Sequence, residues 1–177
     1  IEKNRFSIVN FYERRARRIL PALFFVMLVC IPFAWMWSFN EQYREFSQSL
    51  IAVSLFVSNI FFMKQNGYFH AAAEEEPLLH TWSLAVEEQY YLFFPIFLFF
   101  VWRFGKNRVF WIIIVFATIS LLLSEWGWRN HKNANFYLAP TRVWELLAGS
   151  ISAFIVQKKG VQKNDVLSLF GLAAIAF

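Results

Sequence analysis

Long runs of apolar side chains follow one another along this chain and constrain its fold more than any other feature. A helix needs about 20 mostly apolar residues to cross a membrane. Apolar runs close to that length occupy residues 19–37, 46–63, 84–102, 109–124 and 143–157, and another begins at 166–177. The alternation of polar and apolar residues that marks a strand does not appear between them. The sequence therefore predicts an all-α, polytopic transmembrane helical bundle with five spans and the beginning of a sixth.

The composition excludes the other broad classes of protein. Of the 177 residues, 58% are hydrophobic and 21% aromatic, while only 16% are charged. A soluble domain carries about 25% charged residues, and a single core of this size cannot bury so many aromatic side chains. The net charge of +5 comes from basic residues grouped between the apolar runs, so lipid is the expected partner and nucleic acid is not. The single cysteine, Cys30, lies in an apolar run and is expected to be a packing residue.

Basic residues predict the orientation of the spans, because cytoplasmic loops of membrane proteins are rich in Lys and Arg. Several arginines precede the first run, which assigns that end to the cytoplasm, and residues 103–108 and 158–163 are the next most basic segments. Strict alternation of the spans places 103–108 on the opposite side, in conflict with its charge. Two explanations stay open: residues 46–63, the most polar run, re-enter the membrane without crossing it, or three local charges are too few to decide.

The arginines before the first run form the first polar motif. Helical spacing puts Arg14 and Arg18 on one face with Arg15 beside Arg18, and it brings Glu13 within reach of Arg17. One interpretation is a basic collar attracted to anionic lipid headgroups. The other is a clamp for the phosphates of a nucleotide-bearing donor, because the planar guanidinium fork matches phosphate oxygens.

The second motif places carboxylates inside an apolar run. His80, Ser83 and Glu87 share one face of a helix, while Glu88 and Tyr91 follow on an adjoining face. An acidic residue at the centre of a span costs on the order of 2.5–3.5 kcal/mol, so such residues are functional candidates by default. The alternative is a helix that begins near the interface, where both glutamates stay hydrated.

A third motif follows near the end of the chain. Arg142, Glu145 and Gly149 share one helix face, and the first two can form an ion pair that is either structural or functional. His70 and His131 lie in polar connections and are expected to be solvated. No carboxylate–histidine spacing typical of a metal site appears, so a metal is not expected.

These three motifs, in this order and spacing, resemble the membrane acyltransferase-3 family, whose members include bacterial O-acetyltransferases of lipopolysaccharide and other cell-envelope glycans. The stretch PLLHTWSLAVEEQYYL at 77–92 carries most of the resemblance, with FYERRARRILP at 11–21 and TRVWELLAG at 141–149. The resemblance implies a bundle of about ten helices in the bacterial inner membrane, of which this chain holds five to six. It also implies transfer of an acyl group, usually acetyl, from cytoplasmic acyl-CoA to a hydroxyl of an envelope glycan such as lipopolysaccharide O-antigen or peptidoglycan.

The resemblance further implies roles for individual residues. It assigns donor binding to Arg14, Arg15 and Arg18 and catalytic positions in the bundle to Glu87 and Glu88. Further polar positions within the bundle are Ser83, Arg142 and Glu145. Within this chain His80 is the candidate base, although we expect it to position rather than react.

The catalytic histidine of the family stands eleven positions after an arginine, a spacing that no histidine here shows. We therefore expect that histidine upstream of Ile1, and we expect this chain alone to be inactive. Some members of the family continue into a periplasmic SGNH-type hydrolase domain.

A second class of function also fits charged residues in interrupted membrane helices. A transporter or flippase for a lipid-linked glycan would use them without covalent chemistry. A membrane anchor for another domain would not need Glu87, Glu88 and Arg142. Transfer of label from an acetyl thioester to envelope glycan separates an acyltransferase from both.

Overall fold

The described part of the chain is helical throughout. The structure, a computed structural model, describes residues 7–65, 76–160 and 171. Its elements are α1 (Ile8–Trp37), α2 (Asn40–Ser54), α3 (Ser58–Gln65), α4 (Thr81–Val101), the 3₁₀ turn η2 (Trp102–Phe104), α5 (Lys106–Asn130), α6 (Lys132–Tyr137) and α7 (Ala139–Lys159). No strand occurs among these residues, which confirms the all-α prediction. Most of the run expected at 166–177 lies outside the described residues.

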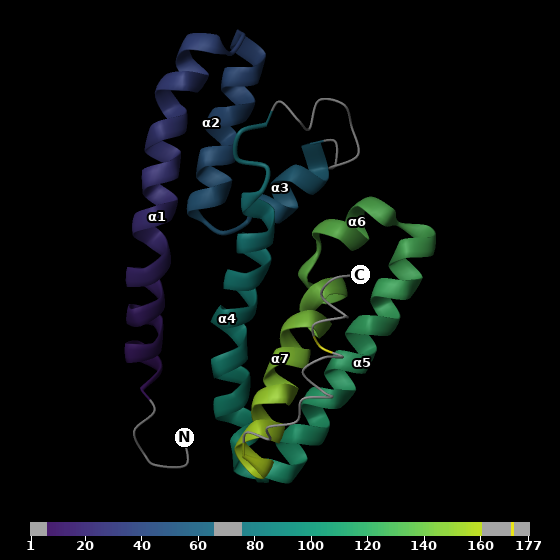
Figure 1. Ribbon diagram of the computed structural model, residues 1–177. Helices are drawn as coiled ribbons and strands as arrows, with labels where there is room; N and C mark the ends of the chain where they lie inside the picture. Colours follow the sequence, from purple (N-terminus) through teal and green to yellow (C-terminus); the bar gives the residue numbers. More distant parts are fainter. Residues whose placement is uncertain (1–6, 66–75, 161–170, 172–177) are drawn as a thin grey trace.

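Three of the helices are long and apolar enough to cross a membrane. They are α1, the continuous stretch Thr81–Phe104 formed by α4 and η2, and α5. At 1.5 Å per residue, the 30 residues of α1 extend for about 45 Å. Helix α7 has 21 residues and returns alongside α5 (Figure 1). The protein is therefore a multi-pass membrane protein.

Residues 46–63, expected to cross as one span, instead form parts of two short helices joined by a sharp turn. Helix α2 has 15 residues and α3 has 8, or about 22 and 12 Å, and neither reaches across a hydrocarbon core of about 30 Å. In Figure 1, α2 descends from the upper end of α1 to about mid-height, and α3 turns back upward. The structure thus agrees with the re-entrant interpretation of this run.

The polarity of this run explains why it does not lie against lipid. Ser49, Ser58 and Asn59 are buried, and buried polar groups need hydrogen-bond partners within the protein. Ser49 Oγ donates to the carbonyl of Phe46 (2.7 Å), and Ser58 Oγ donates to the carbonyl of Thr81 at the start of α4 (3.1 Å). The first bond satisfies Ser49 within α2, and the second joins α3 to the start of α4.

The re-entrant hairpin also removes the conflict over charge. With α2 and α3 folded as a hairpin, the start of α1, the α4–α5 connection and the end of α7 all lie at one end of the molecule (Figure 1). That end carries the basic segment of α1, then Arg103, Lys106 and Arg108, and finally Lys158. The positive-inside rule assigns this end to the cytoplasm.

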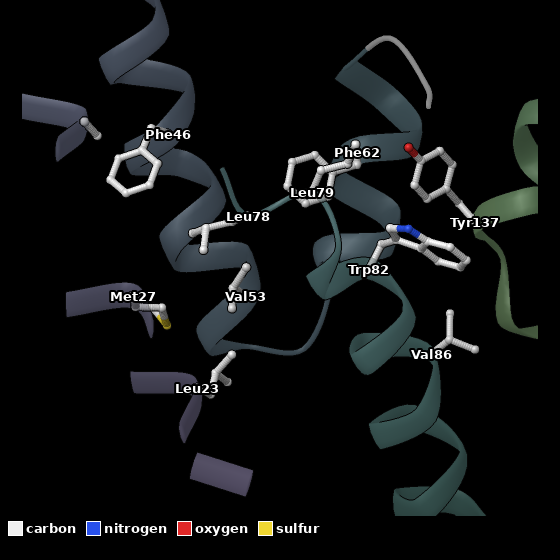
Figure 2. Packing of buried hydrophobic residues seen from close by; sticks show 11 residues of the cluster. Leu23, Met27, Phe46, Val53, Phe62, Leu78, Leu79, Trp82, Val86 and Tyr137 are labelled. Carbon is white, nitrogen blue, oxygen red and sulfur yellow. The ribbon is translucent and has the colours of Figure 1, made fainter. Parts of the chain in front are cut away.

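Two clusters of buried side chains hold the helices together. One joins α1, α2, α3, α4 and α6 around Trp82, whose ring centre lies 5.5 Å from that of Tyr137 (Figure 2). The ring centre of Phe136 lies 4.5 Å from that of Trp82. Cys30 packs against this cluster, as its apolar surroundings predict. The other joins α4, α5 and α7 around Tyr90, Val109, Ile113 and Leu147. The outer faces of the long helices expose large apolar side chains, as a lipid-facing surface requires.

Candidate active site

An ion pair inside the bundle joins α1 to α4. Arg15 Nη2 donates to Glu88 Oε1 at 2.7 Å, and Arg15 Nε lies 3.0 and 3.1 Å from the two carboxylate oxygens. The side chains are only 19% and 14% exposed. The guanidinium carbon of Arg15 also lies 3.3 Å from the centre of the Tyr91 ring. This bidentate pair is of the strong, charge-assisted kind, and it satisfies Glu88 within an apolar helix.

The helical period explains why Arg15, and not its neighbours, meets α4. Tyr12, Ile19, Leu23 and Met27 recur at spacings of three and four with Arg15, so all of them lie on the face of α1 that points into the bundle. The hydroxyl of Tyr12 donates to the carbonyl of Leu92 at 2.6 Å, one turn below the ion pair.

The remaining arginines of this motif do not take part in the ion pair between α1 and α4. Arg14 and Arg18 are exposed, and Arg17 pairs with Glu13 at 2.7 Å, as the spacing predicts. The structure therefore does not bring Arg14, Arg15 and Arg18 together into one clamp.

A cavity of about 490 Å³ opens between α1 and α4 beside the ion pair. Arg15 and Glu88 contribute its charged groups, and the turn between α2 and α3 contributes to its wall. Its lining consists of Tyr12, Arg15, Ala16, Ile19, Leu20, Leu55, Phe56, Val57, Glu88, Gln89, Tyr91, Leu92 and Phe93. Such a cavity, mostly apolar with a few polar groups, is typical of a small-molecule site.

The two glutamates of the second motif face different surroundings. Glu88 is bound to Arg15, whereas Glu87 is exposed and shares its exposed face with Ser83 and His80. Ser83 Oγ donates to the carbonyl of His80 at 3.2 Å. Glu88 is thus held in an ion pair, whereas Glu87 is exposed on the helix face that also carries a histidine and a hydroxyl group.

The third motif lies beside the start of α4, at the end opposite the basic α4–α5 connection. Arg142 Nη2 and Glu145 Oε1 are 3.3 Å apart, so the predicted ion pair within the helix is confirmed. The guanidinium carbon of Arg142 is 5.0 Å from the ring centre of Trp82 and 5.5 Å from that of Phe136. Neither residue lines the cavity beside Arg15, and it is Arg142 that joins α7 to α4 and α6 through these rings.

The sequence patterns assign no role to a pair of side-chain amides, Gln89 and Asn59, of which Gln89 lines the cavity. Gln89 Nε2 donates to the carbonyl of Phe56 and to Asn59 Oδ1, both at 2.9 Å. Asn59, only 1% exposed, donates to the carbonyl of Tyr137 at 3.1 Å. The signal that could have found them is the one that found Glu88: a polar side chain within an apolar run. Within the ranges 7–65 and 76–160, no group of three His, Cys, Asp or Glu side chains could hold a metal ion.

The sequence of this chain is similar to those of known acyltransferases. A family model described as an acyltransferase domain matches residues 2–177. The chain is 36% identical over 161 residues to an uncharacterized protein of Haemophilus influenzae, a match that covers 86% of the chain and 65% of that protein. It is 32% identical over 182 residues to the O-acetyltransferase OatA of Staphylococcus aureus, covering 96% of the chain and 30% of OatA.

A further relative is the peptidoglycan O-acetyltransferase OatA of Listeria monocytogenes, 32% identical over 161 residues, or 87% of the chain and 26% of that protein. The chain therefore spans less than two thirds of the length of each of these relatives. No solved structure shows a significant match to it.

Proposed function

Because the chain belongs to the acyltransferase-3 family, we propose that the whole protein is a membrane O-acyltransferase that modifies a cell-envelope glycan. The donor is an acyl-CoA, in the first place acetyl-CoA, in the cytoplasm, and the protein resides in the bacterial inner membrane. The observation that carries the proposal is the ion pair of Arg15 and Glu88 beside a cavity between two membrane helices. A pure membrane anchor does not need such a pair.

The proposed acceptor is a hydroxyl group of a sugar in peptidoglycan. The name of the Listeria monocytogenes relative supports this choice, since it is a peptidoglycan O-acetyltransferase. Lipopolysaccharide O-antigen is the second acceptor that fits the same chemistry.

The reaction exchanges one bond to the acyl carbon for another. The acceptor oxygen attacks, a C–O bond forms, the C–S bond of the thioester breaks, and the coenzyme leaves as a thiol. The proton of the acceptor hydroxyl passes to a base, and negative charge develops on the acyl oxygen. Arg15, fixed by Glu88 and Tyr91, lies in the cavity as a positive group for the donor, while the exposed Arg14 and Arg18 are the candidates for its phosphates.

The acceptor side of the reaction is assigned to the exposed face of α4. Glu87 is the open carboxylate of this face and orients or supplements the base. Ser83 and His80 lie on the same face toward the outer end of the helix, where they position the sugar. The two glutamates therefore have separate roles, since Glu88 fixes the donor side and Glu87 serves the acceptor side.

The test replaces each carboxylate by its neutral isostere in the full-length protein. Glu87→Gln and Glu88→Gln are each expected to abolish transfer of radiolabel from acetyl-CoA to envelope glycan, measured per amount of protein present in the membrane. Glu125→Gln, on an exposed pair at the end of α5, is the matched control and keeps its activity. Full activity in both variants would contradict these roles, and a wild-type protein that moves glycan without transferring label would be a transporter.

A further inference from the structure

The turn between α2 and α3, at the cavity wall, has a backbone conformation that glycine usually supplies. Helix α2 ends in a Schellman motif, in which the Val57 amide donates to the carbonyl of Ala52 (2.9 Å) and the Phe56 amide to that of Val53 (3.0 Å). The left-handed position of this motif is occupied by Phe56, with φ 54°. Among the described residues it is the only non-glycine residue with positive φ, so this backbone is strained and needs support from its surroundings.

Gln89 supplies that support from the neighbouring helix. Its amide group donates to the carbonyl of Phe56 at 2.9 Å and to the side chain of Asn59 at the same distance. Asn59 is buried and bound in turn to the carbonyl of Tyr137 on α6. The turn is therefore fastened to α4 and α6, one residue beyond the glutamate that binds Arg15.

The wall that the turn contributes to the cavity is apolar. Leu55, Phe56 and Val57 line the cavity together with apolar residues of α1 and α4, whereas Arg15 and Glu88 contribute its charged groups. Figure 1 places the turn at mid-height between α1 and α4. The residues of α1 and α4 that line the cavity, from Tyr12 to Leu20 and from Glu88 to Phe93, lie on those two helices beside it. If a donor enters from the cytoplasm, its polar thioester lies beside the charged pair. Its apolar acyl chain then lies against the turn.

We propose that the Leu55–Val57 turn, held in place by Gln89, limits the length of the acyl chain that the cavity accepts. This inference rests on the proposed function, since it concerns the donor of that reaction. Phe56 closes the space beyond the thioester, and Gln89 is a positioning residue that acts through the turn. A short acyl group fits below the turn, and a longer one collides with it.

The experiment compares donors of different chain length on the full-length protein in membranes. Phe56→Gly removes the side chain while placing at φ 54° the residue that favours it. The ratio of kcat/KM for hexanoyl-CoA to that for acetyl-CoA should rise about ten-fold or more, because one methylene against an apolar wall changes discrimination by about 10- to 200-fold. Val57→Ala and Gln89→Ala should raise the same ratio. Ile51→Ala, on the exposed face of α2 and outside the cavity, is the matched control and should not.

The outcomes separate this inference from the function on which it rests. A Phe56→Gly protein with the wild-type ratio overturns the inference while the function stands. A wild-type protein that transfers no acyl group from any thioester overturns both. If the variant binds donors but does not turn over, competition of hexanoyl-CoA against labelled acetyl-CoA for binding gives the same ratio, and an unchanged ratio again overturns the inference.

Discussion

At the scale of single residues, the pair of Arg15 and Glu88 is expected to contribute both to the stability of the protein and to its activity. Removing one partner of a fully buried pair destabilises a protein by about 3–5 kcal/mol, because the other charge is left without compensation, and this value is the upper limit for the part-buried pair here. We therefore expect Arg15→Met and Glu88→Met each to lower the melting temperature of the purified full-length protein. The double variant should recover most of the loss but remain inactive.

The exposed pair at the end of α5 serves as the control for this double-mutant cycle. Glu125 and Arg129 are 59% and 74% exposed, and such i,i+4 pairs contribute about 0.3–0.5 kcal/mol. Arg129→Met should therefore leave the melting temperature almost unchanged. Additive losses in the double variant of Arg15 and Glu88 would show that the two side chains do not depend on each other.

Whether an ion pair can be predicted from the sequence depends on whether both partners lie in the same helix. The pairs Glu13–Arg17 and Arg142–Glu145 lie within one helix, so spacing alone predicts both. The bond between Arg15 and Glu88 spans 73 positions, and spacing assigns Arg15 to the same group as Arg14 and Arg18. Only the arrangement of α1 against α4 shows that this arginine faces inward and meets a carboxylate.

At the scale of elements, a close approach between α5 and α6 requires a glycine. A Cβ atom on Gly127 would lie 2.6 Å from Asn135 Oδ1, 3.0 Å from Asn135 Cγ and 3.1 Å from Asn135 Cβ. Gly127→Ala is expected to push α6 away and lower the free energy of unfolding by about 1–3 kcal/mol, less the gain in helix propensity of about 1 kcal/mol. A lower melting temperature of the full-length protein in detergent would measure this effect.

A second substitution tests whether the contact itself is responsible. Asn135→Ala removes the two side-chain atoms nearest to the added methyl group. The Gly127→Ala substitution should therefore lower the melting temperature less in the Asn135→Ala background than in the wild type. A Gly127→Ala protein that melts like the wild type would contradict the close packing of α6 on α5.

The elements also show where sequence patterns are sufficient and where they are not. Apolar runs predict α1, α4 and α5 because each helix is long and its outer face meets lipid. The run 46–63 is apolar enough to suggest a span, but Ser58 and Asn59 find their partners on other elements of the bundle. The break at Phe56 carries no glycine or proline signal, since a phenylalanine occupies the left-handed position.

At the scale of the whole molecule, the re-entrant hairpin decides on which side every later loop lies. If α2 and α3 enter and leave on the outer side, the α4–α5 connection is cytoplasmic and the α5–α6 connection is external. If residues 46–63 crossed, both positions would exchange sides. The basic residues favour the first arrangement, because each Lys or Arg near an anionic cytoplasmic leaflet contributes about 1 kcal/mol.

Single cysteines introduced at exposed positions test this arrangement directly. In the full-length protein with Cys30→Ala and any other cysteine replaced, Asn40→Cys and Asn130→Cys should react with a membrane-impermeant maleimide added to spheroplasts, whereas Asn107→Cys should react only in inverted vesicles. Asn40 lies outside in both arrangements, so it reports that the reagent and the protein are sound. Labelling of Asn107→Cys in spheroplasts together with protection of Asn130→Cys would show that residues 46–63 cross the membrane. The cavity beside Arg15 would then lack the turn that contributes to its wall, so this one measurement bears on the orientation, the hairpin and the proposed limit on acyl length together.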